Sequence, residues 1–138
     1  EMAAAAAELF IGQGIRTSLE TNGPDLLTKE AVCLKASCGA GHLDSIFRGL
    51  ARIDLEKPAP SFEPIRQRLE EMEDRESLCT IFFSADARLE FQQLLEKFRK
   101  EKREFIWFCP VNRAIRPEIN AGIRPYTRLI DVEEGGRL

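Results

Sequence analysis

The chain has 138 residues, the commonest size for a single folded domain, and apolar residues make up 43% of it. Its 20 basic and 23 acidic residues give a net charge of -3, so no overall field attracts nucleic acid or an anionic membrane. This composition excludes a disordered chain, and no apolar run approaches the roughly 20 residues of a membrane span. We expect one globular domain over residues 1–138, in the cytoplasm or the nucleus.

The four cysteines, Cys33, Cys38, Cys79 and Cys109, are spread over a long stretch of the chain. A domain of this size can bury enough apolar surface without disulfides. Reduced thiols are therefore expected, which agrees with an intracellular location.

The N-terminal part predicts a helix followed by a strand. Five consecutive alanines begin residues 1–20, and Ile11, Ile15 and Leu19 follow at the four-residue spacing of a helix. Residues 22–24, Asn-Gly-Pro, are typical of a helix end. Residues 30–37 alternate in polarity, which predicts a half-buried strand.

The next segment predicts a connection and two further elements. Residues 38–42 contain two glycines and favour a flexible connection, whereas residues 43–55 fit a helix at their start and a strand at their end. Residues 57–60 form a proline-rich link. Ser61 can cap a helix that places Ile65, Leu69 and Met72 on one face, with charged residues on the other.

The clearest unit is a βαβ crossover at residues 78–109. Two apolar strands, at residues 78–83 and 105–109, flank a helix that Ser84 or Asp86 can cap. The helix carries an apolar face at helical spacing: Phe91, Leu94, Leu95 and Phe98. Such units are right-handed, with parallel interior strands. A last short strand is predicted at residues 127–132.

These elements predict a compact two-layer α/β domain with about four strands and three or four helices around the βαβ unit. An α+β arrangement with partly antiparallel edge strands is the alternative.

Residue types that carry chemistry occur without a complete motif. Cys33, Cys38 and His42 could ligate zinc, or Cys38 and His42 could form a nucleophilic pair, but the spacing fits no standard zinc pattern and no third orienting residue is evident. The glycines at residues 39–41 lack the rest of a phosphate-binding loop. We therefore expect no metal and no cofactor, and a protein that is not an enzyme.

One enzymatic alternative remains at the predicted carboxyl ends of the two strands of the βαβ unit. Ligands of open α/β sheets bind there, and the ends carry Ser84 and Asp86 in one case and Asn112 and Arg113 in the other. Those polar groups could bind a small polar ligand in a small enzyme. They are equally suited to capping a helix and satisfying a loop.

The long connection at residues 112–128 is the candidate binding segment. Basic residues at the end of the preceding helix complement the helix dipole, but the arginines of the connection have no such explanation. Arginine and tyrosine are enriched at protein interfaces. The predicted binding residues are Asn112, Arg113, Arg116, Ile123, Arg124, Tyr126 and Arg128.

The sequence therefore predicts a non-enzymatic protein–protein interaction domain, a scaffold or adaptor within a larger protein or assembly. The alternative is a nucleic-acid-binding domain that uses the basic helix end and the arginines of the connection. The acidic total charge favours a protein partner. An acidic helix face at residues 70–76 together with the basic connection also allows self-association.

Overall fold

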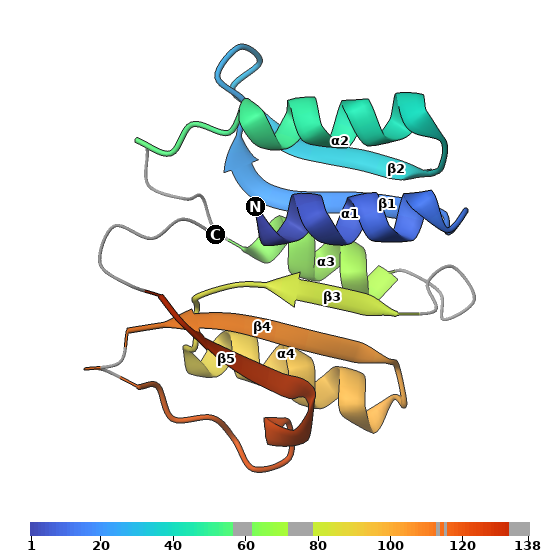
Figure 1. Cartoon of the computed structure of the whole chain (residues 1–138). Coiled ribbons are helices and arrows are strands. Elements are labelled where there is room, and N and C mark those ends of the chain that lie inside the picture. Colours follow the sequence, from blue (N-terminus) through green and yellow to red (C-terminus); the bar gives the residue numbers. More distant parts are fainter. Residues whose placement is uncertain (57–61, 72–78, 113, 115, 133–138) are drawn as a thin grey trace. The chain divides into compact units, whose positions relative to one another are not determined.

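The structure is a computed structural model, and it describes residues 1–56, 62–71, 79–112, 114 and 116–132. Over these residues it contains four α-helices and five strands in two sheets (Figure 1), so the predicted mixed α/β fold class is confirmed. The chain divides into two compact units, Glu1–Glu70 and Glu71–Leu138. The expectation of a single domain over residues 1–138 stays a prediction.

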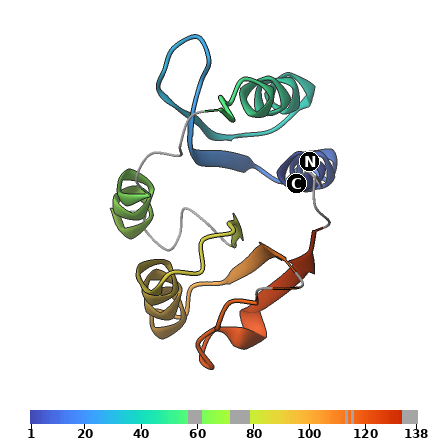
Figure 2. The same ribbon diagram turned by 90° about the vertical axis from the view of Figure 1, so that its left-hand side faces the viewer.

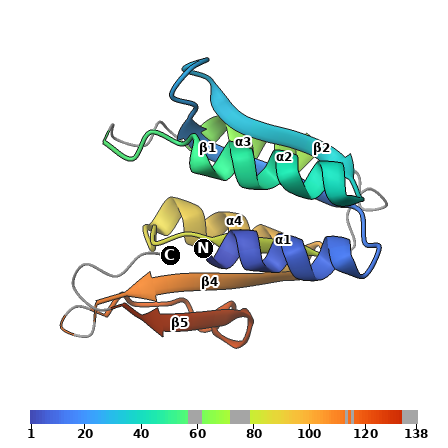
Figure 3. The same ribbon diagram turned by 45° about the horizontal axis from the view of Figure 1, so that its top comes forward.

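The first unit is a β-hairpin with helices. Its elements are α1 (Met2–Gly12), β1 (Thr17–Pro24), β2 (Ala31–Ser37), α2 (Ala40–Ala51) and α3 (Glu63–Glu71). The two strands are antiparallel, and α2 packs along β2 (Figure 3). Ala7, Ile11 and Ile46 form the buried core that joins α1 to α2, with Leu19 and Leu34 packed against it.

The helix predicted for residues 1–20 is wrong in its second half, because α1 ends at Gly12 and β1 begins at Thr17. Gly14 has a φ of 76°, in the left-handed region where a glycine turns the chain at little cost. The strand then contains β-branched threonines, and the Thr21 hydroxyl donates to the Val32 carbonyl at 2.8 Å. The four-residue spacing of Ile11, Ile15 and Leu19 therefore does not mark one helix, because it runs across the end of α1 and the start of β1.

The flexible connection predicted at residues 38–42 is also wrong, since α2 already begins at Ala40. Gly39, with a φ of 94°, makes the turn before the helix, and its carbonyl accepts from the Leu43 N–H at 3.1 Å. Residues 43–55 are helical up to Ala51. Beyond it, Ile53 forms an isolated antiparallel bridge with Asp25.

The structure confirms the strand predicted at residues 30–37, which is β2. It also confirms the next predicted helix, which is α3, and the side chains of Ile65 and Leu69 on this helix are buried. The Arg68 guanidinium on α3 donates to the Glu20 carboxylate on β1 at 2.8 Å. The proline-rich link, Ser61 and Met72 lie outside the described residues.

The second unit contains the predicted βαβ crossover. Its elements are β3 (Thr80–Phe83), α4 (Leu89–Lys100), β4 (Phe105–Val111), the short 3-10 helix η2 (Arg124–Tyr126) and β5 (Thr127–Asp131). The sheet order is β3-β4-β5 and both pairings are parallel, which confirms the βαβ unit and the last strand. Among the described strands only β4 is interior, so the prediction of two interior strands is wrong for β3, which lies at the sheet edge. Figure 2 shows α4 against one face of this sheet.

An aromatic core joins α4 to the sheet. Phe91, Leu94, Leu95 and Phe98 are all buried, as predicted, and the Phe91 ring meets that of Trp107 edge-on at 5.1 Å. Burial alternates along β4, where Phe105, Trp107, Cys109 and Val111 are buried. β4 and β5 of this sheet carry the two ends of the connection at residues 112–126.

Candidate functional site

Residues 112–126 connect β4 to β5, and the structure describes residues 112, 114 and 116–126 of this connection. The Asn112 carboxamide oxygen accepts from the Ala114 N–H at 2.8 Å, which fixes the start of the connection. Further on, the Asn120 carbonyl accepts from the N–H groups of Ile123 and Arg124. The turn leads into η2 and then into β5.

Buried groups hold this connection against the unit. Ile119 and Ile123 are buried, and so is Gln92 of α4 with 4% of its surface exposed. The Gln92 amide nitrogen donates to the Glu118 carbonyl at 2.8 Å, and its oxygen accepts from the Asn120 N–H at 2.8 Å. These two hydrogen bonds and the burial of Ile119 hold residues 118–120 against α4.

The sequence predicts Ile123 as a binding residue because it lies in the 112–128 segment between arginines. The structure places it in the core, with 0% of its surface exposed. The Thr127 hydroxyl and the Tyr126 N–H both donate to its carbonyl. Its side chain stabilises the connection and is not available to a partner.

Three described arginines of the predicted binding segment are exposed and donate to nearby acceptors, two in the connection and Arg128 on β5. Arg124 donates to the Ile119 carbonyl at 3.0 Å, and Arg128 donates to the Pro125 carbonyl at 2.9 Å. Arg116 and Asp131 form an ion pair with 3.0 Å between Nη2 and Oδ1. These contacts fix the positions of the guanidinium groups without removing them from solvent. Arg113 lies outside the described residues.

Tyr126 lies beside these arginines in η2. It is 40% exposed, and its ring lies against that of Phe105 with 4.9 Å between ring centroids. One face of the ring is therefore supported by the core while the rest of the side chain remains accessible. This arrangement is typical of aromatic residues at protein interfaces.

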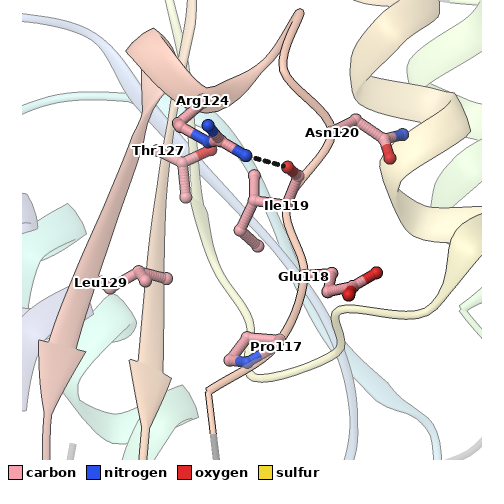
Figure 4. A pocket seen from close by; sticks show the side chains of 7 residues that line it. All are labelled: Pro117, Glu118, Ile119, Asn120, Arg124, Thr127 and Leu129. Carbon is pink, nitrogen blue, oxygen red and sulfur yellow. Dashed lines mark hydrogen bonds between the residues drawn. The ribbon is translucent and has the colours of Figure 1, made fainter.

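An open depression of about 480 Å³ lies between β5 and residues 117–120 (Figure 4). Its lining residues are Pro117, Glu118, Ile119, Asn120, Arg124, Thr127 and Leu129. Sequence reasoning identified only Arg124 among them. The others gave no signal because the depression depends on how residues 117–120 are held opposite β5.

Ser84 and Asp86, which the sequence offered for an enzymatic site, form hydrogen bonds within the turn that leads to α4. The Ser84 hydroxyl accepts from the Asp86 N–H at 3.1 Å, and the Asp86 carboxylate accepts two side-chain hydrogen bonds from Arg88. Those bonds are the main reason why the pKa of Asp86 lies below its ordinary value. Neither residue caps α4, whose N-cap is Arg88.

Cys33, Cys38 and His42 are not grouped into the zinc site considered above. Across the part of the chain that the structure describes, no three His, Cys, Asp or Glu side chains are grouped so that they could hold a metal ion. The His42 Nε2 atom lies 2.6 Å from the Thr17 carbonyl oxygen. Partial burial raises the pKa of the Cys33 thiol, which does not favour a reactive thiolate. The nucleophilic pair considered from the sequence uses Cys38 and stays a prediction.

The sequence matches no protein-family model and no curated protein, and the structure matches no solved structure. In the described ranges, no helix combines the length and the apolar character that crossing a membrane requires.

Proposed function

We propose that the chain is a non-enzymatic protein interaction domain that contacts its partner through residues 112–128. The observation that carries the proposal is the contrast within this segment. Tyr126 and the arginines at 116, 124 and 128 are exposed, whereas Ile119 and Ile123 beneath them are buried.

A surface of this kind suits protein recognition for two reasons. Tyrosine and arginine supply large contact area and directional hydrogen bonds, and they dominate the energetics of many interfaces. The bonds from Gln92 and Arg124 also hold the backbone of residues 118–120, so little conformational entropy of these residues is lost on binding.

The charge of the surface supports a protein partner over nucleic acid. The described residues of this surface carry three arginines, but Arg116 is paired with Asp131, and the depression that Arg124 lines also carries the acidic Glu118. Nucleic-acid binding depends on many uncompensated cations that contact phosphates. A small balanced cluster is better suited to a polar protein interface.

The test is affinity capture from lysate with the full chain and two matched double variants, with and without nuclease. Tyr126→Ala with Arg128→Ala changes the proposed surface. Phe47→Ala with Arg48→Ala changes an exposed aromatic residue and an exposed arginine on α2. Circular dichroism checks that both variants fold.

We expect the first variant to lose partner proteins that the wild type and the second variant retain, with no effect of nuclease. Equal recovery by both variants would show that the surface is wrong. Loss of all partners after nuclease treatment would instead favour the nucleic-acid alternative.

The self-association expected from the acidic face at residues 70–76 and the basic connection remains a second, separate prediction. Most of that acidic face lies outside the described residues. Light scattering of the full chain at high concentration tests it, since a monomer excludes self-association.

A further inference from the structure

The strand β3 has the composition of an interior strand, although it lies at one edge of its sheet. On the face towards α4, Phe82 is buried, and its ring lies edge-on to that of Phe91 with 5.7 Å between centroids. On the opposite face, the Phe83 ring stacks on that of Phe108 with 5.5 Å between centroids. Strands that are apolar on both faces are typical of the interior of parallel sheets.

The outer edge of β3 presents backbone groups that β4 does not use. The N–H groups of Thr80 and Ser84 donate towards β4, to backbone carbonyls at 3.0 and 3.2 Å. Because successive residues of a strand direct their backbone groups to alternate sides, Ile81 and Phe83 direct theirs away from β4. Within the described part of the chain, the backbone N–H and C=O groups of these two residues form no hydrogen bond.

The two edges of this sheet differ in how they are protected. The strand β5 carries Arg128 and Asp131, and Asp131 pairs with Arg116. Charged side chains at an edge hinder its pairing with a further strand. In contrast, β3 contains no charged residue and no proline, and it pairs with β4 without a bulge. Apart from its short length, β3 therefore lacks the features that prevent edge pairing.

We propose that β3 is a binding edge that pairs with an extended apolar segment of a partner protein and thereby becomes an interior strand. The segment exchanges backbone hydrogen bonds with Ile81 and Phe83 and continues the sheet. Its side chains lie beside those of β3, which are apolar on both faces. A charged side chain in this segment would lose its water beside Phe82 or Phe83, so the segment is uncharged.

This binding edge is separate from the surface proposed at residues 112–128. Figure 1 shows β4 between β3 and β5, which lie at opposite edges of the sheet. The two regions can therefore be changed and tested independently.

The probe is a fluorescently labelled nine-residue peptide with the central sequence Val-Ile-Val-Ile-Val and two lysines at each end for solubility. We expect a dissociation constant for the full chain below about 1 mM by fluorescence anisotropy. The control peptide carries a methyl group on each of the five central backbone nitrogens, so it keeps its side chains and charges but cannot pair as a strand. It should bind at least tenfold more weakly. A probe that fails to bind, or a methylated peptide that binds equally well, overturns the proposal.

Variants of the full chain locate the binding. Ile81→Pro removes an outward N–H and leaves the hydrogen bonds to β4 in place, so it should weaken binding of the probe at least tenfold. Leu129→Pro is the matched control at the other edge. The Leu129 N–H points away from β4, because the Val132 N–H, three residues later, donates to the Val111 carbonyl of β4 at 3.0 Å. This control should leave binding unchanged, and circular dichroism checks that both variants fold.

Amide hydrogen exchange tests the same edge without a substitution. In the free chain, the amides of Ile81 and Phe83 should exchange at least tenfold faster than those of Thr80 and Ser84, which are bonded to backbone carbonyls. A saturating concentration of the probe should slow the exchange of Ile81 and Phe83 at least tenfold. Slow exchange of both amides in the free chain would show that the edge is already covered, and an unchanged rate with the probe would show that it binds elsewhere. Either result overturns the proposal.

Light scattering of the full chain identifies a different occupant. Association that grows with concentration and is abolished by Ile81→Pro would make a second copy of this chain the occupant, and the partner segment would be wrong. The surface at residues 112–128 is unaffected by that result, since its test depends on Tyr126 and Arg128.

Discussion

The Gln92 side chain on α4 holds the backbone of Asn120, since its Oε1 accepts from the Asn120 N–H at 2.8 Å. Its amide nitrogen donates to the carbonyls of Ala87 and Glu118 at 2.7 and 2.8 Å. One buried amide therefore satisfies three backbone groups from the turn before α4 and from the connection. This connects the stability of the helix to the shape of the proposed interface.

Gln92→Ala should lower the free energy of unfolding by about 2 to 4 kcal/mol, because it leaves buried backbone groups without partners. Urea denaturation measures the change. Gln93→Ala, at the exposed neighbouring position of α4, is the matched control and should change stability by less than about 0.5 kcal/mol. Similar values for the two variants would show that the Gln92 bonds do not stabilise the unit.

Ile123→Ala should act on stability and not directly on recognition. The side chain is fully buried, so its truncation should cost about 2 to 5 kcal/mol of unfolding free energy. Ile123→Val should cost about 1 kcal/mol. If Ile123→Ala left the urea midpoint unchanged while abolishing partner capture, the side chain would be a contact residue after all.

The βαβ unit could be predicted because its signals are local. The apolar spacing of Phe91, Leu94, Leu95 and Phe98 defines a helix face, and the flanking strands are short apolar runs. The hairpin of the first unit was only half predicted. Residues 17–24 are mostly polar, and their strand exists because they pair with β2, which a local pattern does not reveal.

In the candidate site, too, the features set by local sequence could be predicted and those set by tertiary contacts could not. The exposure of arginines and of Tyr126 follows from residue type, and the sequence located both. The burial of Ile123 and the depression beside Leu129 depend on how the connection is held against α4, to which the two hydrogen bonds of Gln92 contribute. A neutral amide inside a helix with a strong apolar face was the available signal, and it is a weak one.

Two glycines of α2 should respond oppositely to alanine. A Cβ on Gly49 would lie 2.8 Å from Val32 Cγ1 on β2, whereas a Cβ on Gly41 would meet nothing within 4 Å. Val32 is buried and stiff at its first side-chain torsion, so α2 and β2 must separate slightly. Gly49→Ala should therefore destabilise the chain by about 1 to 3 kcal/mol.

Gly41→Ala should instead stabilise by about 0.5 kcal/mol, because alanine restricts the unfolded chain and favours the helix. Thermal denaturation measures the melting temperature of both variants. Both replace a glycine of α2 by alanine, so the change in helix propensity is the same and the difference reports the contact with Val32. Stabilisation by both substitutions would mean that α2 does not pack closely on β2 at Gly49.

Asp25 should make the stability of the first unit depend on pH. Its carboxylate accepts from the N–H groups of Leu27 and Thr28 at 2.7 and 3.2 Å, and these bonds are the main reason why its pKa lies below the ordinary value of 3.8. A carboxylate whose pKa is lowered by folding stabilises the native state above its unfolded pKa. That contribution is lost as the pH falls through the lower, native pKa.

Asp25→Asn keeps an oxygen that can accept both hydrogen bonds but removes the charge. The wild type should therefore be more stable than this variant near pH 6, and the difference should shrink as the pH falls from about 5 to about 2. Urea denaturation at a series of pH values measures it, with Asp44→Asn, which removes an exposed carboxylate from α2, as the control. A stability difference between wild type and Asp25→Asn that stayed constant over this range would mean that the turn holds Asp25 by geometry alone, with no preference for its ionised form.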